Sequence, residues 1–506
     1  MAKRRRKRTK TQKPVKAGYR YLLAALTVLL FVCTWHVLGE KETTYDAKLY
    51  VVNETSAPVY AKPTTTAEKT HTLSRGMSIL VDADVTYLQQ PWRRVAFYIS
   101  GTLHTGYMEP NDLTAYTFDA DFEDDIADFP ETYRQPLRLV HTLYPKWTFT
   151  KYESGLDFSD TAKVYQKKSL ISSDDEDLIV SGKIIEGTVW RRANLKTVRY
   201  YLDPRNGLRA AGALMFETMV YADSDDETMA EALLEDTFMS GTEDISGTTW
   251  ASLFANAAKT YNVNLSNLIA RAIQEQNGYG TLDEAGLGAQ GATATDDTSG
   301  TLYYNIFNIG ANTGVQAGID YACAQGWDTR EKAINGGAKY LAETYIDTGQ
   351  DTLYLQRFDI NRTNIGTHTY MTNISAPYDE GSHLMTIYDT AGITDSARAL
   401  SVPVYKNMPK HTVYPGDASG YNLSVYDAYF YRTMADASVS YTEEAATADD
   451  VLATLRVSYD KDALRDNVDY AVSTKVDGQI LTITLTGLGQ YHKSRTVEAR
   501  LTEEVS

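Results

Sequence analysis

Cysteine is almost absent from this chain of 506 residues, which contains only Cys33 and Cys323. Because Cys33 lies inside an apolar run, no disulfide between the two is indicated, and a disulfide-stapled scaffold is excluded. Cys323 lies in a helix-like apolar stretch, where a small buried hydrophobic residue is favoured over a thiol nucleophile.

Motifs for metal, cofactor and serine chemistry are missing as well. The 8 His include no His-x-x-x-His pair, so neither a zinc hydrolase nor a metal site is predicted. The Gly-x-Ser-x-Gly motif of serine hydrolases is also lacking. The segment Gly286–Gly291 matches Gly-x-Gly-x-x-Gly, but it lacks the flanking strand and helix that dinucleotide binding requires, and no cofactor is predicted.

Positive charge is scarce outside the N-terminus. The net charge is -17 although residues 1–20 alone contain ten Lys and Arg, so the rest of the chain is strongly acidic. An acidic body binds nucleic acid poorly, and no nucleic-acid partner is predicted. Hydrophobic residues make up 43% and charged residues 23%, which excludes collagen-like and wholly disordered chains.

The basic residues precede the apolar run 21–38, which is just long enough to span a bilayer. No small-x-small cleavage pattern follows it, so we expect an uncleaved transmembrane anchor. Since positive charge stays in the cytoplasm, the tail 1–20 is predicted to be cytoplasmic and the chain after about residue 40 extracellular. An exported body without disulfides favours a single-membrane, Gram-positive envelope in which the protein faces the cell wall.

The exported part divides by pattern, and its length suits about three domains. Residues 48–117 contain short alternating apolar runs separated by Pro, Gly and Asp, which predict a small all-β barrel. Residues 129–410 have a mainly helical pattern with polar interruptions. Residues 440–503 alternate again, and a second all-β domain is expected there.

Three local expectations follow from this division. The acidic stretch 119–128 is expected to be a linker. A strand is expected at Leu452–Val457, and Asp477-Gly478 is expected to form a hairpin turn between two later strands.

The stretch with the most chemical information begins with a helix predicted over Leu265–Gly278, with Ser266 as its N-cap. Leu268 and Glu275 are seven positions apart and therefore lie within about 20° on the helix, which places the carboxylate on the apolar stripe. Burial and the negative helix end both disfavour a charged carboxylate, as a general acid requires. An exposed helix end, or a salt bridge to Arg271, is the alternative.

A polar loop over 278–300, rich in Gly, Thr, Ser and acids, follows this helix. It is followed by Leu302–Ala311, which contains Tyr, Phe and Asn. Sugars stack on aromatic rings and hydrogen bond to amides, so the combination suits a saccharide groove. Ordinary core remains the alternative for the aromatic residues.

At these residues the chain resembles the endo-β-N-acetylglucosaminidases of glycoside hydrolase family 73, autolysins that cut peptidoglycan glycan strands. The motifs that carry the resemblance are Phe129–Tyr133, Tyr144–Phe149, Leu156–Phe158, Tyr200–Asn206, Ile273–Gln276, Tyr304–Ala311, Gly326-Trp327, Ala333–Ala338 and His368–Asn373. One departure is Gly207, where a large apolar residue is usual, and looser local packing is expected there.

Two further resemblances flank this region. Residues 48–117 resemble a bacterial SH3-type domain through Ala57–Tyr60, Leu73–Met77, Trp92–Val95 and Gly106–Met108. In that family the module binds cell-wall peptides or spaces a catalytic domain. Residues 440–503 look like a bacterial immunoglobulin-like stalk without chemistry of its own.

The family resemblance implies a set of site residues. Glu275 is the implied general acid. Asp296 and Asp297 are the candidate carboxylates for activating water, and solvated surface is the alternative for both. Attack by the substrate's own 2-acetamido group is the alternative to a second carboxylate. The residues expected to hold or polarise the sugar are Tyr303, Tyr304, Asn305, Asn308, Tyr370 and Asn373. Asp203 and Arg205 are expected to form a structural ion pair that caps a helix.

Together these inferences predict a multidomain fold: a single N-terminal transmembrane helix, a small all-β SH3-like barrel, an α-rich (α+β) lysozyme-like catalytic domain and a C-terminal β-sandwich-like stalk. The implied activity is hydrolysis of the β-1,4 bond after N-acetylglucosamine. The expected partners are peptidoglycan glycan strands, the membrane, and an unknown membrane or wall-synthesis protein. Two alternatives stay open: a muramidase or lytic transglycosylase, and an inactive wall-binding scaffold.

Overall fold

The computed structural model describes residues 41–409 and 432–502, with gaps at 100–101, 118, 223, 225, 278–285, 362, 460–461, 467–468, 488–490 and 493. The predicted tail 1–20 and anchor 21–38 lie outside these residues. Among the residues that are described, none belongs to a helix with the length and apolar character needed to cross a bilayer.

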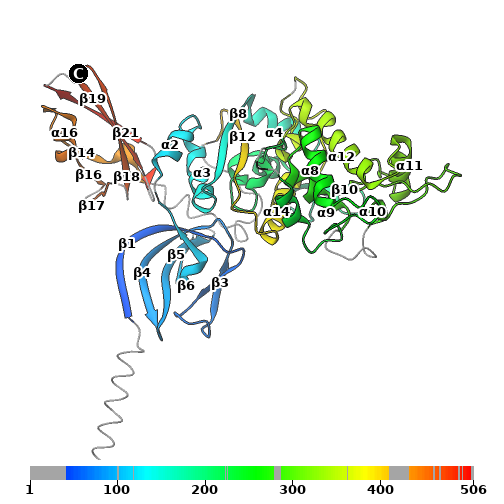
Figure 1. Cartoon of the computed structure of the whole chain (residues 1–506). Helices are drawn as coiled ribbons and strands as arrows, with labels where there is room; N and C mark the ends of the chain where they lie inside the picture. Colours follow the sequence, from blue (N-terminus) through cyan, green and yellow to red (C-terminus); the bar gives the residue numbers. More distant parts are fainter. Residues whose placement is uncertain are drawn as a thin grey trace, which may run out of the picture.

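The first described region is a curved antiparallel sheet that forms a half-barrel (Figure 1). Its strands are β1 (Lys41–Val52), β2 (Ala57–Tyr60), β3 (Lys69–Leu73), β4 (Ser78–Tyr87), β5 (Gln90–Ile99), β6 (Thr102–Met108) and β7 (Leu113–Ala115). They run in the order β3-β2-β6-β5-β4-β1-β7. Alternate residues such as Val59, Ile79 and Phe97 point into one hydrophobic core, as the period of two predicts.

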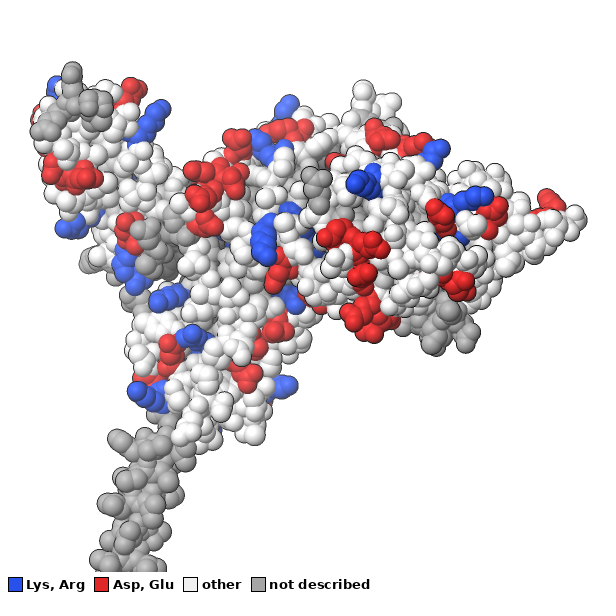
Figure 2. Space-filling model, in the orientation of Figure 1, with Lys and Arg blue, Asp and Glu red and all other residues white. Residues whose placement is uncertain are grey.

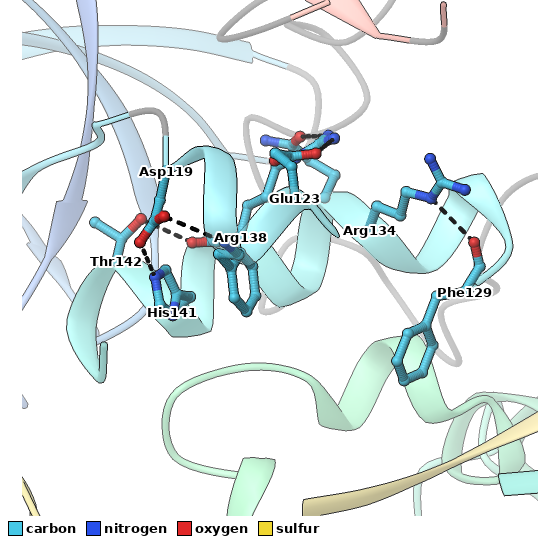
Figure 3. A network of polar contacts seen from close by, with 9 residues as sticks. Asp119, Glu123, Phe129, Arg134, Arg138, His141 and Thr142 are labelled. Carbon is cyan, nitrogen blue, oxygen red and sulfur yellow. Dashed lines mark hydrogen bonds and ion pairs between the residues drawn. The ribbon is translucent and has the colours of Figure 1, made fainter. Parts of the chain in front are cut away.

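The acidic stretch 119–128 is not an extended linker. Asp119 accepts a hydrogen bond from Phe122 N at 3.2 Å and starts the short helix α2 (Ala120–Asp125). Glu123 pairs through both carboxylate oxygens with Arg138, at 2.5 and 2.6 Å, and Asp119 contacts His141 at 3.0 Å (Figure 3). These bonds fold the acids onto helix α3 (Glu131–Leu143), so the linker expectation was wrong.

Helix α3 also receives the N-terminal sheet. Leu139 packs with Leu49, Val51 and Leu80 of that sheet. Figure 1 shows α2 and α3 between the half-barrel and the rest of the helical region.

The helical region is built around a single large hydrophobic core. Its helices are α3, α4 (Phe158–Gln166), α5 (Leu195–Leu202), α6 (Pro204–Gly207), α7 (Glu227–Leu234), α8 (Trp250–Tyr261), α9 (Leu265–Glu275), α10 (Leu287–Gln290), α11 (Val315–Gln325), α12 (Arg330–Thr344), α13 (Leu353–Arg357) and α14 (Ala376–Thr390). The strands β8 (Trp147–Asp157) and β12 (Arg398–Lys406) pair in parallel and tie the two ends of the region together. The strands β9 (Leu170–Ser172), β10 (Ile179–Glu186) and β11 (Trp190–Ala193) form a separate small sheet in the order β10-β11-β9.

Two expectations about the start of this region have different outcomes. Asp203 and Arg205 form the expected ion pair, with 2.9 and 2.7 Å contacts, and Asp203 caps α6. The loose packing expected at Gly207 is wrong. A Cβ at Gly207 would overlap Met215, whose side chain fills the space.

The C-terminal region has its own hydrophobic core. Its elements are β13 (Arg432–Thr433), β14 (Ser438–Ser440), β15 (Glu444–Ala445), α16 (Ala448–Thr454), β16 (Arg456–Tyr459), β17 (Asp462–Ala463), β18 (Tyr470–Asp477), β19 (Ile480–Gly487), β20 (Tyr491–His492) and β21 (Ser494–Leu501). The hairpin at Asp477-Gly478 is confirmed, with Gly478 at φ 60. The strand expected from Leu452 is wrong up to Thr454, because Thr447 and Asp450 form a capping box that starts α16.

The surface agrees with the acidic composition. In the view of Figure 2, Asp and Glu side chains gather in several patches over the helical region, and Lys and Arg are dispersed between them. This face offers no continuous basic track for a nucleic-acid backbone.

Candidate active site

Glu275 is the last residue of α9. The helix begins at an N-cap of Asn264, whose Oδ1 accepts a hydrogen bond from Asn267 N at 2.8 Å, and not at Ser266 as expected. The side chain of Glu275 is exposed, so the expectation of burial was wrong. The side chains of Gln274 and Glu275 lie on the exposed side of the helix end, whereas Ile273 and Gln276 on either side of them are buried.

Asn308 holds the Glu275 side chain. Its Nδ2 donates to the main-chain oxygen of Glu275 at 2.9 Å and to Oε2 at 3.0 Å. Because Oε2 accepts this hydrogen bond, the proton of the acid form belongs on Oε1. The arrangement thus leaves one carboxyl oxygen free to donate a proton.

Gln276 fixes the segment that carries Asn308. Its buried Nε2 donates to Ile306 O at 3.1 Å and to Asn308 Oδ1 at 3.3 Å. Its Oε1 accepts from Ala289 N at 3.0 Å, which ties α10 to the end of α9. Sequence reasoning assigned no role to Gln276, although it is the last residue of the motif Ile273–Gln276.

Arg271 lies one turn before Glu275 but does not pair with it. Its Nε donates to Asn267 Oδ1 at 3.1 Å and its Nη2 to Gln356 Oε1 at 2.8 Å. Its guanidinium lies over the ring of Tyr370, 5.6 Å from the centroid. The contacts of Arg271 therefore connect α9 to α13 and to the segment before α14, and the salt-bridge alternative is wrong.

Tyr370, a predicted sugar contact, lies in the same cluster. Burial raises the pKa of its hydroxyl, Arg271 acts against this, and the negative charges of Glu380 and Glu275 add to the increase. The Tyr370 hydroxyl therefore stays protonated and can donate a hydrogen bond.

Glu380 on α14 was missed by sequence reasoning. It is half-buried, and burial raises the pKa of its carboxyl to about 6. Arg271 opposes this shift, whereas the charges of Glu275 and Asp379 reinforce it. No sequence motif marks Glu380, because it reaches the site only through the packing of α14 against α9.

Asn373 lies at the edge of this cluster. Its Oδ1 accepts hydrogen bonds from Ser375 N and Oγ, both at 3.1 Å, and its side chain also bonds to Asp379. These contacts shape the turn before α14, and sugar binding by Asn373 stays a prediction.

The structure does not join the two loop acids to Glu275. Asp297 Oδ1 accepts from Ser299 N at 2.7 Å and from Ser299 Oγ at 2.5 Å, and these bonds hold its pKa below the usual value. Asp296 is exposed. Their role in activating water stays a prediction. Two further acids of the loop, Asp283 and Glu284, lie outside the described residues.

The aromatic segment after the loop is mainly internal. Tyr304 and Asn305 are buried. The Nδ2 of Asn305 donates to Ile309 O at 2.7 Å and to Gly318 O at 2.8 Å, which favours the core interpretation for both residues. Tyr303 is half-buried, and hydrogen bonds to Cys323 and Asp297 raise its pKa to about 12. Cys323 is half-buried, not fully buried as expected.

Arg330 anchors the base of this segment. Its Nε donates to Ala289 O at 2.9 Å and its Nη1 to Glu243 Oε1 at 2.5 Å. The guanidinium lies 5.4 Å from the ring of Trp250 and 5.3 Å from that of Tyr304. One buried cation thus joins α8, α10, α12 and the start of the segment that carries Asn308.

Comparisons with known proteins agree with the autolysin resemblance over part of the chain. No family model matches the chain. A segment is 37% identical over 156 residues to the bifunctional autolysin of Staphylococcus epidermidis, covering 30% of this chain. This segment is homologous to autolysins. The chain spans only 11% of the length of that relative.

Two solved structures are similar to part of this chain. Staphylococcus aureus glucosaminidase B covers 53% of this chain and 97% of its own, at 24% identity and a TM-score of 0.41. A catalytic mutant of S. aureus Autolysin E, crystallised with the disaccharide NAG-NAM, covers 47% of this chain and 93% of its own, at 22% identity and a TM-score of 0.33.

Proposed function

We propose that the chain is a peptidoglycan hydrolase, an endo-β-N-acetylglucosaminidase in which Glu275 is the general acid. The observation that carries the proposal is the exposed carboxyl group at the end of α9, with Oε2 held by Asn308. The homology to bifunctional autolysins supports it.

In this mechanism, Oε1 of protonated Glu275 gives its proton to the glycosidic oxygen while the bond to C1 of N-acetylglucosamine breaks. Asn308 keeps the proton-bearing oxygen turned away from the protein and remains bonded to Oε2 as the carboxylate forms. Because the Asn308 bond strengthens when Glu275 becomes charged, it favours the transition state over the ground state.

The remainder of the chain would place this activity at the wall. The basic tail 1–20 and the apolar run 21–38 would anchor the protein in the cell membrane, with the catalytic region outside. The half-barrel over 48–117 would act as an SH3-type module that binds wall peptides or spaces the enzyme. Residues 440–503 would be an immunoglobulin-like spacer.

Protease digestion of protoplasts tests the proposed topology. The tail 1–20 should stay protected from the protease, and release of a form of the protein that starts near residue 40 would contradict the anchor.

The activity is tested with the full-length protein in detergent on purified peptidoglycan, followed by borohydride reduction and mass spectrometry. Reduced N-acetylglucosamine ends are expected. Reduced N-acetylmuramic ends would indicate a muramidase, anhydro ends a lytic transglycosylase, and unchanged glycan an inactive scaffold. The Glu275→Gln variant is the control for a contaminating hydrolase.

A further inference from the structure

We infer that Glu380 is the second carboxyl group of this site and acts as the base that removes a proton from the attacking water. The inference rests on the proposed glycosidase function and adds a residue that no motif marks. Three observations carry it: the place of Glu380 on the helix that packs against α9, its lack of an ionic partner, and the absence of a hydrogen bond between it and Glu275 in the described structure.

The first observation is location. Glu380 lies in the first half of α14, which packs against α9. The charged and titratable groups that face Glu380 or share its cluster are Glu275 and Arg271 of α9, Tyr370 of the preceding segment and Asp379 of its own helix. It is therefore part of the group of side chains around the proposed acid, although the two carboxylates are more than a hundred residues apart in sequence.

The second observation is the contrast with other buried acids of the same region. Asp203 pairs with Arg205 at 2.7 Å, Glu217 with Arg398 at 2.7 Å, and Glu243 with Arg330 at 2.5 Å. In the described part of the chain, no ion pair or hydrogen bond is made to the Glu380 carboxylate. Its cationic neighbour Arg271 is instead bonded to Asn267 and Gln356.

A half-buried carboxylate without a partner lowers stability, because its charge loses hydration without compensation. Residues of this kind collect at functional sites, where the cost is tolerated for chemistry. The raised pKa of Glu380, about 6, suits a base that is ionised near neutral pH and still takes up a proton readily.

The third observation is the relation between the two carboxyl groups. Glu380 and Glu275 influence each other through charge, and no hydrogen bond joins them in the described structure. Two carboxyl groups that are not bonded to each other leave room for a water between them, as the inverting mechanism requires. Two carboxyl groups in direct contact would not.

The reaction then balances as follows. The Glu380 carboxylate takes one proton from water while the water oxygen bonds to C1 of N-acetylglucosamine. The C1–O bond to the next sugar breaks, its electron pair goes to the leaving oxygen, and that oxygen takes the proton of Glu275. The products are a reducing sugar of inverted anomeric configuration and a free hydroxyl. Proton exchange with solvent restores both carboxyl groups.

The test uses the full chain in detergent and three variants: Glu380→Gln, Glu380→Asp and Asp389→Asn. Glu380→Gln should lower kcat/KM on peptidoglycan by about 10²- to 10⁴-fold, the usual value of a general base, with an unfolding temperature equal to or above that of wild type. Glu380→Asp keeps the charge but shortens the side chain, so its kcat/KM should lie between those of Glu380→Gln and wild type. Asp389 is the matched control, because it is an acid in the last turn of the same helix and pairs with Arg75 at 2.5 Å; its variant should stay within about tenfold of wild type.

Two readouts separate a catalytic from a structural role. The acidic limb of the kcat/KM profile should disappear in Glu380→Gln, and NMR of the first product of wild type should show the α anomer. Near-full activity of a folded Glu380→Gln variant, or a β anomer from wild type, overturns the inference but leaves the proposed glycosidase intact. Absence of any glycan cleavage by wild type overturns both.

Discussion

A single nitrogen of Asn308 donates to both the main-chain oxygen and the side-chain Oε2 of Glu275, at 2.9 and 3.0 Å. The first bond satisfies a carbonyl at the open end of α9, and the second orients the carboxyl group. Asn308 reaches this position with φ 52, a left-handed conformation that Asn tolerates better than most residues. The helix end and the proposed acid are therefore positioned by the same side chain.

The first prediction concerns Asn308. Asn308→Gly removes the donor but keeps the left-handed backbone accessible, so the loop should retain its shape. A hydrogen bond to a charged group is worth about 1.5–3 kcal/mol, and kcat on peptidoglycan should fall by about 10- to 100-fold. Asn308→Asp should be more damaging, since it places a like charge against Glu275. Equal activity of the Gly variant and wild type in a reducing-end assay would contradict the orienting role.

The second prediction concerns Glu275 itself. Glu275→Gln keeps an oxygen that accepts from Asn308 but has no acidic proton, and activity should fall by at least about 10²-fold. Because the side chain is exposed, the unfolding temperature should stay at the wild-type value, which calorimetry checks. Loss of folding together with activity would assign Glu275 a structural role.

Sequence pattern was sufficient to predict the helix that carries Glu275, because a period of 3.6 is a local property. It was not sufficient to predict the exposure of Glu275. The i and i+7 argument assumes that neighbouring elements cover the apolar stripe as far as its last turn, but in the structure Glu275 is exposed although Ile273 and Gln276 near it are buried. Burial at a helix end depends on tertiary contacts that the helix pattern does not contain.

The same limit explains why sequence reasoning missed Glu380 and why it assigned the acidic stretch after residue 118 to a linker. Glu380 reaches α9 only after α14 docks, and nothing in its local sequence predicts that contact. The acids at Asp119 and Glu123 indicated a linker by composition, whereas their partners Arg138 and His141 lie on the following helix (Figure 3). In both cases, the structure depends on contacts with another helix, which the local sequence around the acid does not contain.

The third prediction tests why α12 contains adjacent glycines. A Cβ at Gly337 would overlap the ring of Phe307, and one at Gly336 would overlap Trp327. Gly337→Ala should cost about 1–3 kcal/mol through overpacking and should also lower activity, since Phe307 adjoins Asn308. Gly182→Ala is the control, because no heavy atom lies within 4 Å of its added Cβ. Thermal unfolding of both variants decides the point, and equal midpoints would refute the packing argument.

The last prediction concerns stability in acid. Burial acts to raise the pKa of Glu243, but hydrogen bonds from Ser246 and Arg330 outweigh it and hold the pKa at about 2, against an ordinary value of 4.5. A depressed pKa in the folded state means that the unfolded state binds more protons, so this contribution to stability is complete above pH 4.5 and is lost as the pH falls toward 2.

The unfolding temperature of wild type should therefore decrease across this window. Glu243→Gln should be less stable at pH 7, because it leaves the buried Arg330 without its buried partner, and it should show a flatter pH dependence. Asp244→Asn is the matched control: Asp244 also contacts Arg330, but its side chain is 64% exposed, so its loss should have a small effect. Parallel curves for wild type and Glu243→Gln between pH 4.5 and 2 would show that Glu243 is not the group responsible.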